Sequence, residues 1–292
     1  MANLGPVGGY LPISFTRVPP ADSQRDAVRR LERAGYRAVW TNEVVGGKDA
    51  LVQLAVLLAA TERLTFGTGI ATIWSRAPQA LHAAAAFLAD AHPDRLVLGV
   101  GVGYPQQAEA AGRDFGHPLA TMRDYVARID AQTRPPAPTA AYPRILAANG
   151  PKTLALAAEI ADGALPAGLP PAFTREARAV LGPDKLLVVG LTVVSEPDAG
   201  RARAAAVERV TQTLSLPTFG TALRRLDFSL DDVEGLADAV VAHGGPDAIA
   251  AKVREHLAAG ADHGVLMPPP ADDFGAGIAV LERLAPAFAD LG

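Results

Sequence analysis

The stretch RILAANGPKTLALAAEIADGALPAG, residues 144–168, predicts a strand, a helix and a second strand in direct succession. The apolar run RILAAN (144–149) is typical of a buried strand, and Pro151–Ala161 predicts a helix with proline at its first position. GALPAG (163–168) predicts the next strand. Because two apolar strands joined through one helix are typical of a parallel β-α-β unit, this stretch indicates an α/β protein.

The same alternation continues on both sides and predicts eight strand–helix units. The other predicted strands are 7–13, 38–43, 64–70, 95–101, 185–194 and 264–268. The other predicted helices are 22–34, 51–61, 78–91, 119–132, one within 171–181, 198–214, 246–259 and a last one ending near residue 289. Eight units favour a (β/α)8 TIM barrel over a doubly wound open sheet, which shows the same alternation.

We predict that this barrel is a single domain spanning residues 1–292. The loop RPPAPTAAYP (134–143) contains too many prolines for either regular structure. Residues 215–245 lack clear periodicity, and we expect a less regular insertion there.

Composition excludes several classes of protein. With 49% hydrophobic and 20% charged residues the chain can bury a large core, and its net charge of −4 disfavours nucleic acid as a partner. There are no cysteines, and the histidines lack metal-ligand spacing, so we expect no metal site. No apolar run reaches the roughly 18 residues of a membrane span, and the amino terminus lacks signal-peptide character. We therefore expect a cytoplasmic protein that binds a small molecule rather than nucleic acid or a membrane.

The residues that follow the strands are the candidates for a site, because the carboxyl ends of barrel strands carry the chemistry. Glu43 ends the second predicted strand. Burial there would raise the pKa of its carboxyl group and suit it to acid–base catalysis. Alternatively, Glu43 would accept hydrogen bonds from neighbouring loops. The sequence leaves both roles open.

Two turns are candidates for a phosphate site. Gly150 allows a ligand close to the backbone, Pro151 suits a helix start, and Lys152 adds a charge at the positive end of that helix. GVG before Tyr104 is a second glycine-rich turn, without the third glycine of a dinucleotide fingerprint. The fourth and fifth strands would be neighbours, so both turns could hold one phosphate. Ordinary turns with a solvent-exposed lysine are the alternative.

Several stretches resemble the luciferase-like flavin and deazaflavin oxidoreductases. They are LERAGYRAVWTNE (31–43), TERLTFGTGIATIWSRAP (61–78), PDRLVLGVGVGY (93–104), LAANGPKTLALAAEIADGALP (146–166) and GGPDAIAAKVREHLAAGADH (244–263). The fourth is similar to a G-P-[KR]-M-L-x-L-A-A-x-x-A-D-G segment of that family. The resemblance spans nearly the whole chain and favours the coenzyme F420-dependent branch.

This resemblance implies an enzyme that transfers a hydride between coenzyme F420, a deazaflavin, and a small organic substrate at the mouth of the barrel. An FMN-dependent monooxygenase and a non-catalytic flavin- or deazaflavin-binding barrel are the alternatives. The resemblance also implies a homodimer, and a cofactor phosphate near Gly103, Tyr104, Gly150 and Lys152.

It further implies a non-proline cis peptide after the third strand, near the segment Ile70-Ala71-Thr72, behind the cofactor ring. The cofactor-binding residues expected on this basis are Ile70, Ala71, Thr72, Gly101, Gly103, Tyr104, Asn149, Gly150, Pro151 and Lys152.

The substrate pocket and the acid–base group are less defined by the sequence. We expect Trp74 and Phe15 to line an apolar pocket. Luciferase-like proteins often carry a histidine after the acidic residue of the second strand, whereas here Val44 follows Glu43. The sequence therefore identifies neither the substrate nor the proton donor beyond the candidate Glu43.

Overall fold

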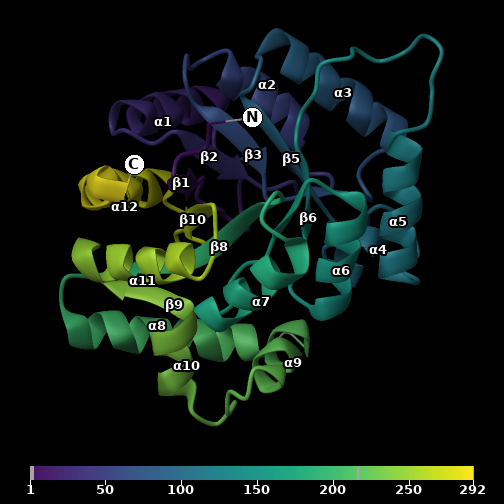
Figure 1. Cartoon of the computed structure of the whole chain (residues 1–292). Helices are drawn as coiled ribbons and strands as arrows, with labels where there is room; N and C mark the ends of the chain where they lie inside the picture. The colour runs from purple at the N-terminus through teal and green to yellow at the C-terminus, as the bar shows by residue number, and fades with distance from the viewer. Residues whose placement is uncertain (1–2, 216, 292) are drawn as a thin grey trace.

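A computed structural model describes residues 3–215 and 217–291 as a closed parallel barrel surrounded by helices (Figure 1). Its strands are β1 (Val7–Tyr10), β2 (Ala38–Thr41), β3 (Thr65–Thr68), β4 (Ala71–Thr72), β5 (Leu96–Gly101), β6 (Arg144–Ala147), β7 (Gly163–Leu165), β8 (Leu186–Ser195), β9 (Val241–Gly244) and β10 (His263–Met267). The barrel order is β1, β2, β3, β5, β6, β7, β8 and β10, and β10 pairs with both β8 and β1. The predicted eight-stranded barrel is confirmed, and the open sheet is excluded.

Helices cover the outside of the barrel in the described part of the chain. They are α1 (Ala21–Arg33), α2 (Ala50–Leu58), α3 (Pro78–Ala91), α4 (Pro105–Ala110), α5 (Pro118–Ile129), α6 (Pro151–Ile160), α7 (Pro171–Leu181), α8 (Ala199–Leu214), α9 (Pro217–Arg225), α10 (Val233–Val240), α11 (Pro246–Ala258), α12 (Phe274–Leu284) and the 3-10 helix η1 (Ala285–Leu291). None of these described helices has the length and apolar character needed to cross a membrane.

The segment 215–245 is more regular than the sequence predicts. Its described residues include α9, α10 and β9, and β9 pairs with the last residues of β8, Thr192–Ser195. The barrel strand β10 instead pairs with Val188–Thr192 of β8. β9 is therefore an extra strand beside the barrel. Elements of four to nine residues contain too few periods for their hydrophobic pattern to be recognised.

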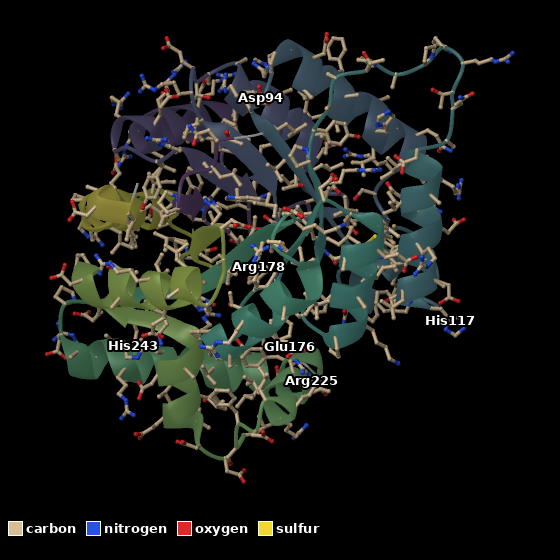
Figure 2. All side chains as sticks on the ribbon, viewed as in Figure 1. Asp94, His117, Glu176, Arg178, Arg225 and His243 are labelled. Atoms are coloured by element: carbon tan, nitrogen blue, oxygen red, sulfur yellow. The ribbon has the colours of Figure 1, made fainter. Side chains whose placement is uncertain are left out.

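The insertion contacts helix α7 of the barrel through α9. Arg225 forms an ion pair with Glu176 of α7, with an N···O distance of 2.7 Å, and its guanidinium lies 5.7 Å from the ring centroid of Phe173 (Figure 2). The proline-rich loop, in contrast, arches away from the body between α5 and β6 (Figure 1). Near its end, Tyr142 Oη lies 2.7 Å from His82 Nδ1 on α3.

The interior of the barrel has its own apolar cluster. Its fully or nearly buried members are Leu4, Tyr10, Ala38, Trp40, Val97, Ile145, Leu165, Val188 and Val265. Side chains alternate between the two faces of a strand. In each strand, every second residue after a member of this cluster therefore also faces the barrel interior. At the carboxyl ends of the barrel pairings these inward residues are Gly101, Ala147, Thr192 and Met267. The resulting mouth carries neutral and mostly small or apolar side chains.

Two buried histidines are held in the neutral form. In the barrel interior, His263 Nε2 accepts a hydrogen bond from Trp40 Nε1 (3.0 Å), and its Nδ1 donates to the Gly5 carbonyl (2.7 Å). His256 Nδ1 on α11 lies 2.8 Å from Thr174 Oγ1. Burial lowers the pKa of each imidazole to about 4. Both rings therefore stay uncharged at neutral pH.

We expect acid to destabilise the fold between pH 6.5 and pH 4. In this range the unfolded chain, with ordinary histidine pKa values near 6.5, binds more protons than the folded chain, so stability falls as the pH falls. The loss should be about 3 kcal/mol per histidine by pH 4. Urea unfolding at several pH values measures it. The His256→Gln variant should lose less stability between pH 6.5 and pH 4 than the wild-type protein. His117 is exposed (Figure 2), and His117→Gln serves as the control variant. A profile that is flat from pH 7 to 4.5 would contradict the expectation.

Candidate functional site

Three loops meet at one end of the barrel. Residues 71–72 of β4 pair with residues 100–101 of β5, and Val100 of β5 pairs with Leu146 of β6. The predicted neighbourhood of the fourth and fifth barrel strands is confirmed. Three segments therefore follow strand ends that lie side by side: 70–76, 102–104 and 148–152. They contain most of the expected cofactor-binding residues.

The floor between these loops is made of small side chains. A Cβ atom added to Gly101 would lie 2.9 Å from Ile70 Cγ1 and 3.2 Å from Ala147 Cβ. Glycine is therefore required if Ile70 is to lie across β5. Ile70 and Ala147 are partly exposed, and together with Gly101 they form a contiguous apolar surface that a larger side chain would obstruct.

The backbone behind this floor contains the cis peptide expected after the third strand. It joins Gly69 and Ile70, one residue before the expected segment. The Gly69 carbonyl accepts a hydrogen bond from Tyr10 Oη (2.6 Å), and the Ile70 carbonyl accepts one from the N–H of Glu43 (3.0 Å). Burial raises the pKa of Tyr10, so its hydroxyl remains a neutral donor. Strands β1 and β2 thus both hold the bulge.

The three residues expected to contact the cofactor from this bulge are placed differently. Ile70 faces the floor, but the side chains of Ala71 and Thr72 are fully buried. Ala71 packs in the apolar layer between the barrel and its helices. The pleat directs these two side chains into the protein, so a cofactor contact at Ala71 and Thr72, which stays a prediction, would use their backbone.

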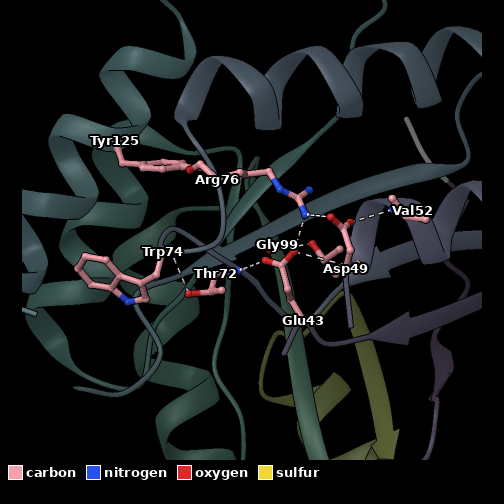
Figure 3. Close-up of polar contacts among 10 residues, drawn as sticks. Glu43, Asp49, Val52, Thr72, Trp74, Arg76, Gly99 and Tyr125 are labelled. Atoms are coloured by element: carbon pink, nitrogen blue, oxygen red, sulfur yellow. Dashed lines mark hydrogen bonds and ion pairs between the residues drawn. The ribbon is translucent and has the colours of Figure 1, made fainter. Parts of the chain in front are cut away.

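Glu43 holds the bulge from its outer side (Figure 3). Since Trp40 points into the barrel, the alternation of β2 directs Glu43 away from the mouth. Glu43 is 3% exposed, Oε2 accepts the N–H of Thr72 (2.9 Å), and Oε1 accepts Arg76 Nη2 (2.7 Å). Burial raises the pKa of this carboxyl group, against the opposing effects of Arg76 and Thr72. The geometry favours the hydrogen-bonding role over the catalytic one.

Trp74 does not line an open pocket. It is 6% exposed, its Nε1 donates to the Val102 carbonyl (2.7 Å), and its ring lies 5.9 Å from that of Phe115. The bulge turns the indole ring into the packing beneath the loop that follows β5, and a substrate-pocket role for Trp74 stays a prediction.

Phe15, in contrast, is 87% exposed. Its neighbours Ser14 and Thr16 both donate to the carboxylate of Asp272, which lies after β10. A cleft of about 410 Å³ lies beside this contact, between the loop after β1, α1 and the start of α12. The residues around this cleft include none from the three cofactor loops, so it is separate from the floor. A substrate-pocket role for Phe15 stays a prediction.

The turn before α6 combines a fixed amide with an exposed cation. Asn149 Oδ1 accepts the N–H of Ala167 (2.9 Å) and its Nδ2 donates to the Ala167 carbonyl (3.3 Å), so this amide joins the ends of β6 and β7. Thr153 Oγ1 donates to the Gly150 carbonyl (2.8 Å). Lys152 is exposed in the first turn. Asn149 therefore positions the turn, while Lys152 and the first N–H groups of α6 stay available for a ligand.

The turn after β5 depends on a residue that the sequence analysis did not single out. Gln107 Oε1 accepts the N–H of Tyr104 (2.9 Å) and would lie 1.6 Å from a Cβ atom at Gly103, whose φ is +55°. Only glycine fits there. Tyr104 is 50% exposed at the same turn. The sequence signal for this contact is a glutamine, Gln107, two residues after the proline that begins α4.

A second overlooked residue is Lys48. The turn 44–48 is closed by two hydrogen bonds between the backbones of Val44 and Lys48 (3.0 and 2.9 Å). It returns the chain to the end of β2, where Lys48 Nζ donates to Asn42 Oδ1 (2.7 Å) and Thr41 Oγ1 (3.2 Å). The pair Gly46-Gly47 is the sequence signal for this chain reversal, because glycine pairs indicate a tight turn.

An apolar floor beside an exposed lysine at a helix start is typical of an enzyme barrel with a ligand site at its strand ends. Residues 7–263 match the family described as luciferase-like monooxygenase, and the chain belongs to this family.

Two curated relatives illustrate its similarity to known proteins. A putative coenzyme F420-dependent oxidoreductase of Mycobacterium tuberculosis is 31% identical over 188 residues, which cover 53% of this chain and 54% of the relative. The 5,10-methylenetetrahydromethanopterin reductase of Methanolobus tindarius is 25% identical over 170 residues, 52% of each chain. The chain spans about half the length of these curated relatives.

Solved structures match over almost the whole chain. An F420-dependent secondary alcohol dehydrogenase has a TM-score of 0.75 at 15% identity and covers 98% of this chain and 99% of its own. The oxygenating component of a 3,6-diketocamphane monooxygenase of Pseudomonas putida, in complex with FMN, has a TM-score of 0.71 at 14% identity and covers 98% and 96%. At such identities the likeness shows the fold.

Proposed function

We propose that this chain is an oxidoreductase that transfers a hydride between coenzyme F420 and a small organic substrate at the mouth of the barrel. The observation that carries the proposal is the 31% identity to a relative described as coenzyme F420-dependent. The family match over residues 7–263 supports an enzyme of the luciferase-like class.

The mouth of this chain fits a planar ring with a phosphate-bearing tail. Ile70, Gly101 and Ala147 form an apolar surface without a projecting side chain. Lys152 and the first N–H groups of α6 suit an anion, as does the hydroxyl of the half-exposed Tyr104 at the turn after β5. In this proposal Gly103, Tyr104, Gly150 and Lys152 hold the phosphate, and Pro151 sets the direction of α6.

The bound coenzyme would supply a ring carbon that gives or accepts a hydride. The chain supplies position and exclusion of water. Ile70 provides the apolar contact on the floor, and its backbone is held by Tyr10 and Glu43. Apolar Met267 and Ala167, partly buried at the same end of the barrel, limit the access of water. Glu43 acts here by positioning the bulge.

Equilibrium titration of the purified protein with coenzyme F420 and, separately, with FMN tests the proposal. We expect micromolar or tighter binding of the deazaflavin, and its reduction or oxidation by at least one member of a panel of alcohols, aldehydes and enones. Absence of deazaflavin binding would refute this function.

Two other outcomes would point to the alternative functions. Oxygen uptake that depends on reduced FMN and an organic substrate would favour the monooxygenase, which the family match supports. Bound cofactor that no panel member reduces or oxidises would favour a binding protein without catalysis.

Lys152→Ala should weaken deazaflavin binding by about 1–2 kcal/mol, because one charge-assisted contact to phosphate is lost at an exposed position. The change in Kd is measured by titration, and Tm should stay the same. Lys252→Ala is the matched control, since Lys252 pairs with Glu255 on the distant helix α11. If affinity is unchanged while Tm falls, Lys152 has a structural role instead.

A further inference from the structure

Lys48 carries a largely buried ammonium group without an anionic partner among the described residues. Its two contacts, Asn42 Oδ1 and Thr41 Oγ1, are neutral. The two nearest carboxylates in the sequence, Glu43 and Asp49, both bind Arg76 instead (Figure 3). A buried cation is costly unless a partner compensates it. This position therefore favours either a ligand oxygen or the loss of a proton.

The orientation of the ammonium group is fixed by a chain of hydrogen bonds. Thr41 Oγ1 donates to Gln53 Oε1 (2.9 Å), so its lone pairs are left for Lys48. Gln53 in turn donates to Gln24, and Gln24 Nε2 donates to the Pro19 carbonyl (2.7 Å). An ammonium group has three N–H donors. Within residues 3–215 and 217–291 two of them have protein acceptors, which leaves the third for a ligand.

The ammonium group lies at the rim of the barrel mouth. Its two partners are Thr41, the last residue of β2, and Asn42, which directly follows at the carboxyl end of that strand. The other ionisable groups around this strand end are occupied. Glu43 points outward, Tyr10 donates to the Gly69 carbonyl, and Arg76 is bound to two carboxylates.

We propose that Lys48 is the proton donor and acceptor of the hydride-transfer reaction. The inference rests on the function proposed above and assigns the acid–base group that the sequence left unidentified. It also explains how a chain with Val44 after Glu43 can supply a proton, because the turn 44–48 returns a lysine to the end of the same strand.

In the reduction of a carbonyl compound, the hydride and the proton come from two different groups. The carbonyl carbon gains a hydride from the reduced deazaflavin, and the π electron pair of the C=O bond moves to oxygen. The oxygen takes a proton from Lys48 Nζ, which forms the O–H bond of the alcohol and leaves a neutral amine. Solvent reprotonates the amine. Alcohol oxidation is the reverse, with neutral Lys48 accepting the hydroxyl proton as the hydride leaves for the oxidised coenzyme.

The protonation behaviour of Lys48 suits both directions. Burial lowers its pKa to about 8, and general acid–base groups work best when their pKa lies near the operating pH. The charged groups closest in sequence, Glu43 and Asp49, are paired with Arg76, while Gln53 and Gln24 on the helices packed against the turn are neutral. Reduction should therefore decline above about pH 8 and oxidation should decline below it.

The test uses the full chain and begins without cofactor. The protein has four lysines, so the 13Cε signals of lysine-labelled protein can be assigned by single substitutions. We expect the signal that disappears in Lys48→Met to titrate near pH 8 in the wild-type protein. With coenzyme present, Lys48→Met should lower kcat by about 100-fold or more, and its deazaflavin Kd should stay within about threefold. Lys252→Met is the control and should leave both unchanged.

Lys48→Arg separates proton transfer from charge. It keeps a cation at the turn but one that does not release its proton, so alcohol oxidation should be lost at every pH while the fold and deazaflavin binding persist. Wild-type turnover and pH profiles in Lys48→Met, or a Lys48 signal that titrates at the ordinary lysine pKa, would overturn the assignment while the proposed function stands. Failure of the wild-type protein to bind deazaflavin would refute that function, and this inference with it.

Discussion

Arg76→Met should lower the free energy of unfolding by about 3–5 kcal/mol, the largest loss that we expect from a single polar side chain in this protein. Arg76 is 14% exposed and pairs with the fully buried carboxylate of Glu43. Methionine keeps much of the volume but leaves that buried carboxylate without its cation. The bulge 70–76 should loosen, so deazaflavin affinity should fall as well. Urea unfolding, followed by the fluorescence of Trp40 and Trp74, measures the loss of stability.

The pH dependence of this loss identifies its cause. Burial raises the pKa of Glu43, and removal of Arg76 should raise it further. The folded variant then binds more protons than the unfolded chain above the ordinary glutamate pKa, so its stability should fall as the pH rises. The defect should be smaller at pH 5 than at pH 8.

Two further variants complete this test. Asp49→Asn removes the more exposed partner of Arg76 but retains a residue that can accept the N–H of Val52 as the cap of α2, so it should cost little. In a Glu43→Gln background, Arg76→Met should cost much less than alone. An equal cost in both backgrounds would show that the buried charge is not the reason.

Gly99→Ala should destabilise the barrel by about 3 kcal/mol or more, because it forces two backbones apart. A Cβ atom at this position would lie 1.9 Å from the carbonyl oxygen of Thr68 on the neighbouring strand, and a backbone atom cannot move aside cheaply. The Thr68 hydroxyl also donates to the Gly99 carbonyl (2.7 Å), and this contact would be disturbed. Thermal and urea unfolding measure the effect.

Gly200→Ala serves as the matched glycine substitution. Gly200 lies in the first turn of α8, and an added Cβ atom would make ordinary contact with Asp198 at 3.4 Å. Alanine favours a helix by up to about 1 kcal/mol over glycine, so stability should stay equal or rise. A Gly99→Ala protein as stable as Gly200→Ala would contradict the described approach of β3 and β5.

The barrel itself could be predicted from the sequence, because each long strand or helix carries its own pattern. RLVLGVG and KLLVVGLTVV are continuous apolar runs, and both form buried strands. Short elements were not predictable in this way. β9 has four residues, and only its pairing with the end of β8 makes it a strand.

The candidate site was predictable in position but only partly in detail. Strand ends can be read from the sequence, so the loops around Gly101 and Gly150 were found. Side-chain direction after a strand ends depends on how the backbone bends, and this decides that Trp74 is buried whereas Ile70 faces the mouth. Lys48 was missed for a related reason. Its contact with Asn42 exists only because a turn reverses the chain, six residues after that strand position.

Strand β8 pairs with both the barrel and the insertion, through largely different residues, so the insertion can change in evolution independently of the barrel. Its residues Val188–Thr192 pair with β10 and close the barrel, and its last four residues, Thr192–Ser195, pair with β9 of the insertion. Insertions, deletions or exchanges between α8 and β9 would leave the register of the eight barrel strands intact. Related chains that share this barrel should therefore differ most in length within this segment. Diversification of this family would then be concentrated beside the carboxyl end of β8, on the side of the mouth opposite the cis peptide in barrel order.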